Sequence, residues 1–388
     1  MINGQDQQNT CSHITYSFLS LPFLQDLGIG AWGYTEDLTA PSFAYFQQWQ
    51  QSKANPFSYL KKHSQERADL RQIFPSAQSA LVFILPYLKA KFRYQERTSK
   101  AAWRISGHSM AYDGLDYHWV GKNALAKIKR AMENDACLTQ ERLSMAHQAL
   151  NSNASLPPLN TMAGIDTGPV LEKDLAVRAK LGFIGRHGLL QTPFWGSYVF
   201  IAYLILDCRL KLPHSCNSYS ILDPGQAMDA SSLSYCTNCP GLCQRACPVQ
   251  RWPHNEIGKC LAAVTIEKEV PLTAPQNLHG QLLGCDRCQD ACPLNQKLLA
   301  QAKAESLSVV SLGNRYRDDF GRQENVAANQ NFCNLFTLSL PEILAQVQHL
   351  SKRGLQKKFK QTVLAYIGRD KFVAVLQAAV KNSSSVTF

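Results

Sequence analysis

The chain has 388 residues, of which 45% are hydrophobic and 18% charged, so a disordered protein is excluded and packed cores in two or three domains are expected. Forty Lys and Arg residues outnumber 29 Asp and Glu residues, and the net charge of +11 favours a polyanionic partner, with solubility as the simpler explanation. No run of 18 apolar residues occurs, and no basic segment precedes an apolar run near the start, so we expect a cytoplasmic protein without signal peptide or membrane span.

Two short, continuous apolar runs predict buried strands. Residues 79–87 read SALVFILPY, and residues 198–207 read YVFIAYLILD. Neither run alternates polar and apolar residues, which is typical of strands that are covered on both faces. The sequence therefore predicts a sheet that needs helices on either side.

A basic helix is predicted between these strands, over residues 118–132. Helical spacing places Leu125, Ile128 and Met132 on one face of it. The strands and this helix together predict a mixed domain, of the α+β or α/β class, over residues 16–210.

Two stretches are predicted to be irregular. Residues 1–15 form an N-terminal segment ahead of the mixed domain. Residues 209–235 lose apolar periodicity and gather Ser, Pro, Asp and Asn, which predicts a loop or a domain junction. A ferredoxin-like domain is then expected over residues 225–300.

Eight cysteines crowd into one segment of that domain. The first run is Cys236-x2-Cys239-x3-Cys243-x3-Cys247-Pro248, and the second is Cys260 followed by Cys285-x2-Cys288-x3-Cys292-Pro293. In two-cluster ferredoxins the run is C-x2-C-x2-C-x3-C-P, and its fourth Cys ligates the other cluster. The same crossing predicts two 4Fe-4S clusters here. The ligands of the first are Cys236, Cys239, Cys243 and Cys292, and those of the second are Cys247, Cys260, Cys285 and Cys288.

Zinc is the competing explanation, because paired CxxC motifs also form tetrahedral thiolate sites. The two Cys-Pro steps favour iron-sulfur clusters, although the three residues 240–242 exceed the ferredoxin spacing by one. In a reducing cytosol, crowded cysteines are expected to ligate metal rather than to form disulfides. The remaining cysteines stand alone and are expected only to pack. They are Cys11, Cys137, Cys208, Cys216 and Cys333.

The C-terminal tail, residues 301–388, is predicted to be helical and basic. Apolar residues have helical spacing in residues 335–350 and 354–380, and the SKRG between them predicts the connection of a helical hairpin or repeat pair. Eight basic residues face a single acid, Asp370, in the last 37 residues. Clustered cations are the electrostatic footprint of phosphate binding, so contact with nucleic acid is predicted. The basic residues are Lys352, Arg353, Lys357, Lys358, Lys360, Arg369, Lys371 and Lys381.

Residues 164–190 read GIDTGPVLEKDLAVRAKLGFIGRHGLL. Together with the double-cluster segment, this block resembles the epoxyqueuosine reductases, the cobalamin-dependent enzymes of queuosine tRNA modification. Shorter matches are Asp116-Tyr117-His118, PSAQSALVFILPY, Trp195-Gly196-Ser197 and Thr265-Ile266-Glu267. The resemblance covers most of the chain.

The resemblance implies reductive deoxygenation of epoxyqueuosine to queuosine at the wobble position of tRNA. It implies base-off cobalamin between the mixed domain and the ferredoxin-like module, and a HEAT-like helical tail that helps to bind tRNA. A low-potential donor, such as a flavodoxin or ferredoxin, would supply electrons to a protein expected to be a monomer. The clusters would deliver electrons singly, whereas the corrin would store the two that the reaction needs.

Asp166 matches the proton donor of the family. A carboxyl group buried beside a corrin would have a raised pKa and would stay protonated until the opening oxygen takes the proton. The alternative is structural, since an Asp before Thr-Gly-Pro is also a preferred cap for a helix that starts near Val170.

Further site residues are implied by the same resemblance. Gly182, Gly185, Arg186, His187 and Leu190 match the stretch near the corrin, where glycines permit close backbone approach. Ordinary turn glycines and a surface histidine would explain the same pattern.

Tyr117, His118 and Lys173 are the predicted substrate contacts. Lys173 stands where the family often has Arg, and aromatic residues such as Tyr117 are as often part of a core.

The cysteine segment departs from the family pattern. Besides the extra residue after Cys239, the loop from Cys247 to Cys260 is short, and residues 260–265 read CLAAVT where the family has Cys-Ile-Ser-Tyr-Leu-Thr. The chain is therefore either a divergent member with the same reaction or a relative with a changed substrate.

Two other functions remain open. A cobalamin and iron-sulfur reductase of a small molecule, similar to the reductive dehalogenases, would share the corrin and both clusters. The basic tail and the missing export signal argue against it. A ferredoxin-type electron carrier would not need the long region that precedes the first cluster.

Overall fold

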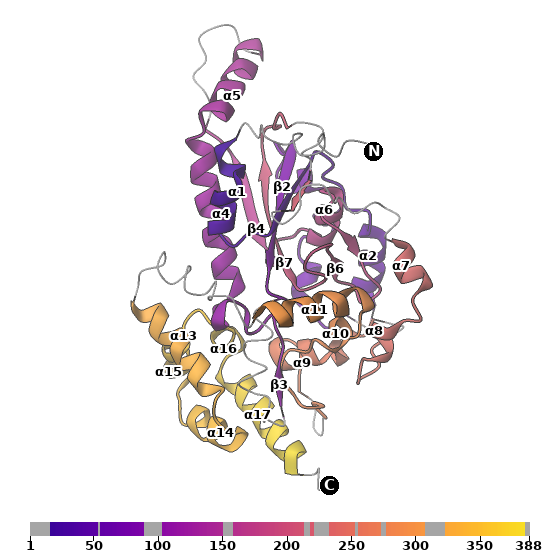
Figure 1. The fold of residues 1–388 in the computed structure, drawn as a ribbon, viewed down its shortest axis with the longest axis vertical. Helices are drawn as coiled ribbons and strands as arrows, with labels where there is room; N and C mark the ends of the chain where they lie inside the picture. The colour runs from indigo at the N-terminus through magenta and orange to yellow at the C-terminus, as the bar shows by residue number, and fades with distance from the viewer. Residues whose placement is uncertain are drawn as a thin grey trace, which may run out of the picture.

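The computed structural model describes residues 16–52, 55–88, 103–149, 158–212, 218–220, 233–252, 255–272, 277–306 and 323–384 (Figure 1). The predicted segment of residues 1–15, with Cys11, and also Cys216 lie outside this described part. Within it, buried apolar side chains form two clusters, one around a sheet and one where the cysteine segment meets the tail. Among these residues, no helix has the length and apolar character that a bilayer span requires.

The main sheet has five described strands in the order β4, β7, β2, β1 and β8. Their bounds are Thr161–Ile165 for β4, Val199–Leu206 for β7, Ser79–Pro86 for β2, Ala31–Thr35 for β1 and Ser218–Ser220 for β8. Both predicted apolar runs are confirmed as β2 and β7, which pair along their whole length, from Ser79 opposite Leu206 to Pro86 opposite Val199. Every described pairing in this sheet is antiparallel, so the mixed class is confirmed in its α+β form.

The prediction of a loop or junction over residues 209–235 is wrong in part. β8 lies within this stretch and pairs with β1, with Ser218 opposite Gly33. The edge of a sheet offers unpaired backbone N–H and C=O groups, so a polar segment joins it through its backbone and needs no apolar periodicity. The start of α7 (Leu233–Asn238) also falls inside the predicted loop.

Helices lie on both sides of the sheet in Figure 1. α4 (Tyr117–Glu133) packs against β4 and β7. Its predicted apolar face is confirmed, because Leu125, Ile128 and Met132 are at most 2% exposed. α6 (Glu172–Arg178) packs against β7 and β1.

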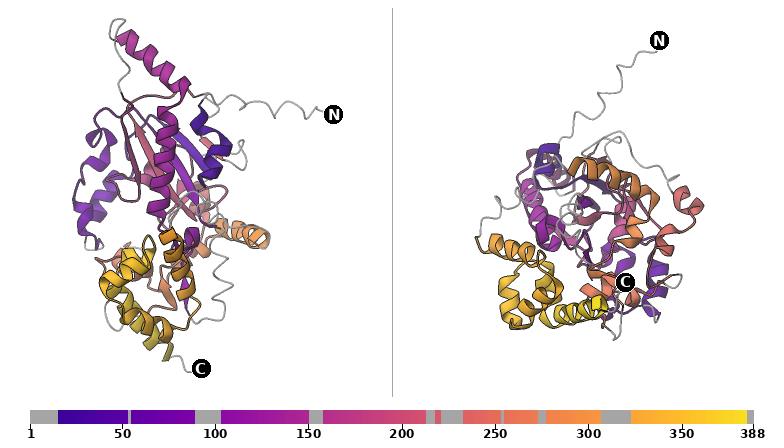
Figure 2. Two further views of the ribbon diagram at one scale, coloured as in Figure 1. Left: turned by 90° about the vertical axis from the view of Figure 1, so that its left-hand side faces the viewer. Right: turned by 60° about the horizontal axis from the view of Figure 1, so that its bottom comes forward.

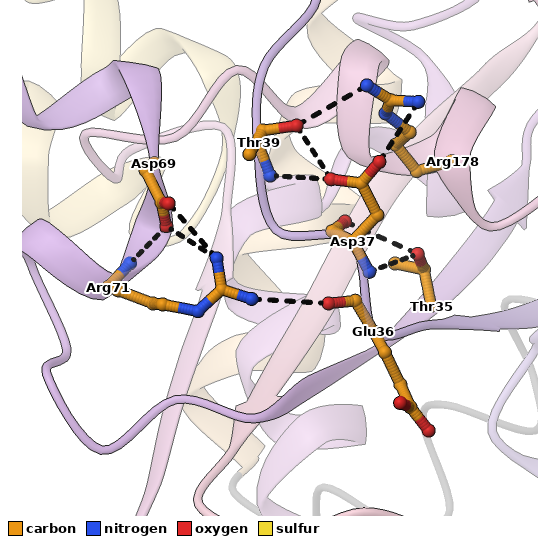
Figure 3. Close-up of polar contacts among 7 residues, drawn as sticks. All are labelled: Thr35, Glu36, Asp37, Thr39, Asp69, Arg71 and Arg178. Carbon is orange, nitrogen blue, oxygen red and sulfur yellow. Dashed lines mark hydrogen bonds and ion pairs between the residues drawn. The ribbon is translucent and has the colours of Figure 1, made fainter.

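Polar contacts hold α6 at both ends. At its last turn, Arg178 pairs with Asp37 at 3.0 Å and donates to Thr39 Oγ1 at 3.3 Å (Figure 3). The hydrogen bond from Thr39, aided by the charge of Arg178, lowers the pKa of the Asp37 carboxyl. Near the start of α6, the buried Asp174 carboxylate accepts hydrogen bonds from the backbone N–H and the hydroxyl of Ser42, at 2.9 and 2.7 Å. The first turn of α6 therefore has a fixed position beside the end of β4.

The other described elements are shorter or lie outside the main sheet. In the mixed domain they are α1 (Leu21–Asp26), α2 (Phe43–Gln51), α5 (Ala136–Ala149) and the antiparallel pair β5 (Phe183–Ile184) and β6 (Leu190–Gln191). In the cysteine segment they are α8 (Leu242–Arg245), α9 (Leu261–Ile266), α10 (Arg287–Asp290), α11 (Pro293–Ser306) and β9 (Gln281–Leu283), which pairs with β3 (Arg104–Ile105). Short 3-10 turns span Ser17–Leu19, Ser58–Lys61, Glu66–Ala68, Leu70–Gln72, Ala111–Gly114 and Ile257–Lys259.

The described part of the tail contains more helices than predicted. They are α13 (Gln323–Leu335), α14 (Leu340–Gln348), α15 (Lys352–Lys358), α16 (Val363–Ile367) and α17 (Arg369–Ser384). The prediction that residues 351–354 connect a simple hairpin is wrong, because Ser351 caps α15 by accepting a hydrogen bond from the backbone N–H of Gly354 at 2.9 Å. Gln361 and Gly368 have positive φ values of 58° and 82°, which interrupt the apolar run between helices.

The tail and the cysteine segment share the second core. Val264 and Leu282 from the cysteine segment and Phe332 and Phe372 from the tail are fully buried in it. In Figure 2 the yellow tail helices lie together at one end of the molecule. The predicted boundary between residues 225–300 and 301–388 separates elements of one core, and it stays a prediction.

Candidate active site

Asp166 lies in the loop that leads from β4 to α6. Its φ of 55° is in the left-handed region, which Asp tolerates better than most residues. The alternative role as a helix cap is not found, because α6 begins at Glu172 and Leu171 is its N-cap residue. The side chain of Asp166 instead contacts the start of α4.

Tyr117 and His118 bring α4 to the Asp166 carboxylate. The Tyr117 hydroxyl donates a short hydrogen bond to Asp166 Oδ2, and His118 Nε2 lies 3.7 Å from the same oxygen. The Tyr117 ring stacks on Phe200 of β7 with a centroid distance of 4.0 Å and an interplanar angle of 4°. His118 also stacks with Tyr117, at 4.1 Å. The structure therefore brings together three residues that the sequence predicts for the site.

Asp116 fixes the orientation of His118. Its Oδ1 lies 2.8 Å from His118 Nδ1 and accepts a hydrogen bond from the backbone N–H of His118 at 2.8 Å. A carboxylate at Nδ1 favours the proton on that nitrogen, which leaves Nε2 directed at Asp166. Asp116 was part of the sequence match, but its role in orienting His118 required the structure.

The expectation that Asp166 is buried is wrong for this structure, since its side chain is 61% exposed. The loop after β4 carries it outward, whereas Gly164 and Ile165 at the end of the strand are buried. The desolvated carboxyl here is that of Glu172, whose pKa is raised well above its usual range by the surrounding protein and then by the charge of Asp166. The backbone N–H of Asp166 donates to Glu172 Oε1 and opposes this shift. Glu172 was missed, although it belongs to the same DTGPVLE block.

Lys173 and Tyr117 lie near the carboxylates of Asp166 and Glu172. Lys173 Nζ donates to the carbonyl of Gly188 at 2.6 Å. Desolvation lowers the pKa of Lys173, while the charge of Asp166 opposes the change. Desolvation followed by the charge of Asp166 raises the pKa of Tyr117 well above its usual value, so its hydroxyl stays a donor. Lys173 thus links the Asp166 loop to the glycine-containing stretch.

Most of that stretch packs inside the protein. A Cβ at Gly182 would lie 2.1 Å from the carbonyl oxygen of Gln191, and one at Gly185 would lie 2.9 Å from the His187 ring. Leu190 is 2% exposed. Gly188, with a φ of 82°, has nothing within 4 Å of an added Cβ, so space remains at this turn. The part of these residues in corrin binding stays a prediction.

His187 is 3% exposed, so the alternative of a surface histidine is wrong. Its Nδ1 accepts a hydrogen bond from the backbone N–H of Leu189 at 3.1 Å, and burial lowers the pKa of its ring to about 4. The neighbouring Arg186 extends outward and donates to the carbonyls of Cys236 and Cys239, at 2.7 and 3.0 Å.

Arg251 makes the reciprocal contact from the cysteine segment. It donates to the carbonyl of His187 at 3.1 Å and to Asn255 Oδ1, and its guanidinium lies 3.8 Å from the Trp252 ring centroid. Only 7% of Arg251 is exposed. Sequence reasoning missed Arg251, which lies in the shortened loop between Cys247 and Cys260.

The predicted crossing of the cysteines agrees with their mutual electrostatics. Burial raises the pKa of Cys243, and the next contribution comes from Cys292, followed by Cys236 and Cys239. Burial likewise raises the pKa of Cys288, with Cys260 and Cys285 adding to the rise. Cys292 therefore influences the thiols of the first run, and its assignment to the first cluster stays a prediction. Cys247 is half-buried, and its place in the second group stays a prediction.

Backbone N–H groups surround the first group of thiols. Hydrogen bonds from Leu242 and Gly241 lower the pKa of Cys239, and those from Asn295 and Leu294 oppose the rise that burial causes at Cys292. Such N–H donors are a feature of iron-sulfur sites, where they tune the cluster. Within the described residues, no three His, Cys, Asp or Glu side chains converge to hold a metal ion. None of the described cysteines is in a disulfide, so the thiols are free to ligate metal, and the iron-sulfur clusters themselves stay a prediction.

The isolated cysteines have no comparable surroundings in the described part. Cys208 and Cys333 are 6% and 7% exposed and pack in the first and second core. Cys137 is half-buried against the first core.

The tail reaches the site through the start of α4. The backbone N–H of Asp116 donates to the carbonyl of Gln361 at 2.7 Å. Tyr366 of α16 donates from its hydroxyl to Glu267 at 2.8 Å, and its ring lies 6.5 Å from that of His118. Burial raises the pKa of Glu267, with the charge of Asp166 adding to the rise. Glu267 belongs to the Thr-Ile-Glu match, whereas no sequence signal pointed to Tyr366.

The fold and site define a class of protein: an antiparallel α+β domain with a surface carboxylate, joined to a segment with two groups of cysteines. The family model "Epoxyqueuosine reductase QueG, DUF1730" matches residues 67–145, which include Asp116, Tyr117 and His118. The resemblance predicted from the sequence is confirmed.

Curated relatives support the same resemblance. The chain is 31% identical over 241 residues to an epoxyqueuosine reductase of Gloeobacter violaceus, a match that covers 60% of this chain and 61% of that protein. It is 29% identical over 240 residues to one of Synechocystis, covering 60% of this chain and 68% of that protein. The chain thus spans roughly two thirds or less of the curated relatives that it matches.

Solved structures share the fold. A crystal structure of an epoxyqueuosine reductase with an epoxyqueuosine-modified tRNA stem loop has a TM-score of 0.58 and 20% identity, covering 95% of this chain and 81% of that chain. The epoxyqueuosine reductase of Streptococcus thermophilus has a TM-score of 0.61 and 17% identity, covering 94% of this chain and 80% of that chain.

Proposed function

We propose that this protein reduces epoxyqueuosine to queuosine at the wobble position of tRNA. The observation that carries the proposal is the constellation around Asp166, which Tyr117 and His118 hold from one side and the basic tail approaches from another. The identity of the substrate is inferred from relatives named epoxyqueuosine reductase, one of which was solved with an epoxyqueuosine-modified tRNA stem loop.

Asp166 is the proton donor in this proposal. Its 61% exposed side chain is accessible to a nucleoside within a large RNA, which a buried carboxyl would not be. When the epoxide opens, the oxygen takes the proton of Asp166, and the Tyr117 hydroxyl then stabilises the resulting carboxylate by its hydrogen bond. His118, oriented by Asp116, has its Nε2 3.7 Å from Asp166 Oδ2. With its own proton on Nδ1, it takes a proton from solvent at Nε2 and passes that proton to the Asp166 carboxylate.

Two 4Fe-4S clusters would supply the electrons. Cys236, Cys239, Cys243 and Cys292 would hold the first, and Cys247, Cys260, Cys285 and Cys288 the second. Removal of an epoxide oxygen as water needs two electrons and two protons, and the clusters would deliver the electrons one at a time. A low-potential flavodoxin or ferredoxin would reduce them.

Cobalamin is the proposed second cofactor, and when bound it would supply two-electron reducing chemistry for the strained epoxide. Gly182, Gly185, Arg186, His187 and Leu190 are its predicted contacts. Gly182, His187 and Leu190 pack inward, and Arg186 is engaged with the cysteine loops, so the accessible part of the stretch is the turn at Gly188. This turn lies beside Lys173, whose Nζ donates to the Gly188 carbonyl.

The tail would bind the RNA backbone. Arg353 and Lys357 of α15 are exposed, whereas Lys352 pairs with Asp370 at 2.7 Å and Arg369 donates to the carbonyls of Leu350 and Gln348. Cations of this kind bind phosphates without reading sequence. A monomeric, cytoplasmic enzyme completes the proposal.

The test is anaerobic turnover. Protein with reconstituted clusters, cobalamin and a low-potential reductant is incubated with tRNA that carries epoxyqueuosine, and the nucleosides are identified by mass spectrometry. Queuosine is expected, and it should be lost when Asp166→Asn replaces the wild type. Absence of queuosine in a preparation with both clusters and bound corrin would overturn the proposal. Clusters without any corrin binding would instead indicate an electron carrier.

A further inference from the structure

We propose that Tyr366 is a stacking surface for one unpaired base of the RNA, next to the nucleotide that reacts at Asp166. This inference rests on the proposed function and adds a binding subsite to it.

Large exposed hydrophobic side chains are few in the described part, and all are tyrosines. They are Tyr45, Tyr59, Tyr235 and Tyr366, with 58%, 49%, 57% and 39% exposure. A single exposed aromatic residue needs no explanation. Tyr366, however, lies at the site, because its ring centroid is 6.5 Å from that of His118.

Tyr366 is held firmly while its ring remains accessible. Its hydroxyl donates to Glu267 at 2.8 Å, which fixes the outer edge of the ring. Lys268 Nζ lies 5.1 Å from the ring centroid, so a cation accompanies the aromatic surface. An anchored ring loses little conformational entropy when it binds a flat ligand, which favours stacking.

The position of Tyr366 indicates a neighbouring base rather than the reacting one. Its ring lies 6.5 Å from that of His118, and His118 in turn stacks on Tyr117, which contacts Asp166. His118 and Tyr117 therefore lie between Tyr366 and the reacting group. The contact from Asp116 to Gln361 keeps α16 close to this side of the site.

The chemistry selects an unpaired nucleotide of RNA. Unpaired bases expose their faces and stack on aromatic side chains, whereas bases inside a duplex are already stacked. Lys268, whose Nζ lies over the ring, suits the phosphate of the same nucleotide. Tyr366 would thus favour a loop within tRNA over a free nucleoside.

The alternative is that Tyr366 merely docks the tail through its hydrogen bond to Glu267. Two variants separate these roles. Tyr366→Phe removes the hydrogen bond and keeps the ring, whereas Tyr366→Ala removes both. Tyr45→Ala is the matched control, because Tyr45 is similarly exposed on α2 and its hydroxyl contacts Asn255.

The experiment uses cluster-reconstituted protein and anticodon stem loops with 2-aminopurine on either side of the wobble nucleotide. Binding of wild type and Tyr366→Phe should quench the fluorescence at one of these positions. Tyr366→Ala should lose the quenching and bind about tenfold more weakly, in line with the contribution of one stacked base. Tyr45→Ala should behave as wild type.

Turnover of the same RNA separates this inference from the proposed function. Tyr366→Ala is expected to raise KM with little change in kcat, because Asp166 is untouched. Equal quenching and affinity in Tyr366→Ala and wild type would overturn the stacking role. A loss in Tyr366→Phe as large as in Tyr366→Ala would also overturn it in favour of tail docking. RNA binding with quenching but no queuosine would refute the proposed function and leave the subsite intact.

Discussion

The two cores of the protein differ in what they need in order to form. The sheet core is built around β2 and β7, whose side chains are covered by helices of the same domain. The second core combines α9 and β9, of six and three residues, with the tail helices, and Cys260 and Cys285 pack against it. Helices this short are not stable alone. The sheet core therefore needs only its own apolar residues, whereas the second core is expected to depend on the predicted clusters.

Removal of the clusters should therefore have the largest effect, and only on one core. In protein freed of iron under anaerobic conditions, the amides of α9 and β9 should lose protection from hydrogen exchange, while those of β2 and β7 keep theirs. Hydrogen-exchange mass spectrometry measures both. If iron removal left the protection of both cores unchanged, the second core would not depend on the clusters.

Single cysteine variants sharpen this first prediction. Cys288→Ser should reduce the iron content by about half, since one of two clusters loses a ligand. Cys208→Ser is the control, because Cys208 is buried in the sheet core and has no predicted ligand role. Similar iron loss in both variants would argue against the assigned ligand sets.

The second prediction concerns Asp166, whose loop lies on the sheet domain. Asp166→Asn should reduce queuosine formation by about 10²- to 10⁴-fold, the range for loss of a general acid, with both cores and the iron content unchanged. Turnover under single-turnover conditions and iron analysis provide the measurement. Near-normal turnover would refute the assignment of Asp166 as the proton donor.

The third prediction is a pH dependence at the contact between the two regions. His187 is buried, and its pKa falls from 6.5 to about 4 on folding, so the unfolded chain binds more protons than the folded one between these values. Stability is then fully present above about pH 6.5 and falls with the pH below it, by roughly 2 kcal/mol between pH 7.5 and 5.

Denaturant unfolding at several pH values measures this slope. His187→Gln should flatten it. His63→Gln serves as the control, because the His63 side chain is 65% exposed and should leave the slope unchanged. An unaltered slope in His187→Gln would place the titrating group elsewhere.

The smallest expected effect comes from Arg251, which joins the regions at His187. Arg251→Gln removes its donation to the His187 carbonyl and its contact with Trp252, so the cluster-loaded protein should lose roughly 1 to 2 kcal/mol of stability. Arg287→Gln is the matched control, since Arg287 is exposed and adjacent to Cys288. Equal decreases of Tm in both variants would mean that the buried contacts of Arg251 do not stabilise the protein more than an exposed arginine does.

Much of the candidate site follows from sequence, but its geometry does not. Asp166, Tyr117 and His118 were predicted by resemblance, and the structure brings them together. The eight cysteines were predicted by spacing, and their division into two ligand sets stays a prediction. The sequence did not predict that Asp166 is exposed, that Glu172 is desolvated, or that Tyr366 lies near His118. Each depends on how segments distant in the chain surround a group, which no local pattern records.

Elements that depend on a local pattern of apolar residues could be predicted from the sequence alone. The apolar runs of β2 and β7 and the amphipathic face of α4 predicted these elements correctly, because apolar periodicity acts over a few residues. The cysteine spacing predicts two ligand sets, which stay a prediction. Only the tertiary structure decided that β8 joins the sheet, that the tail divides into short helices, and that the tail shares a core with the cysteine segment. Backbone pairing at a sheet edge and packing between remote helices are long-range interactions, and they overrode the weak local preferences of these segments.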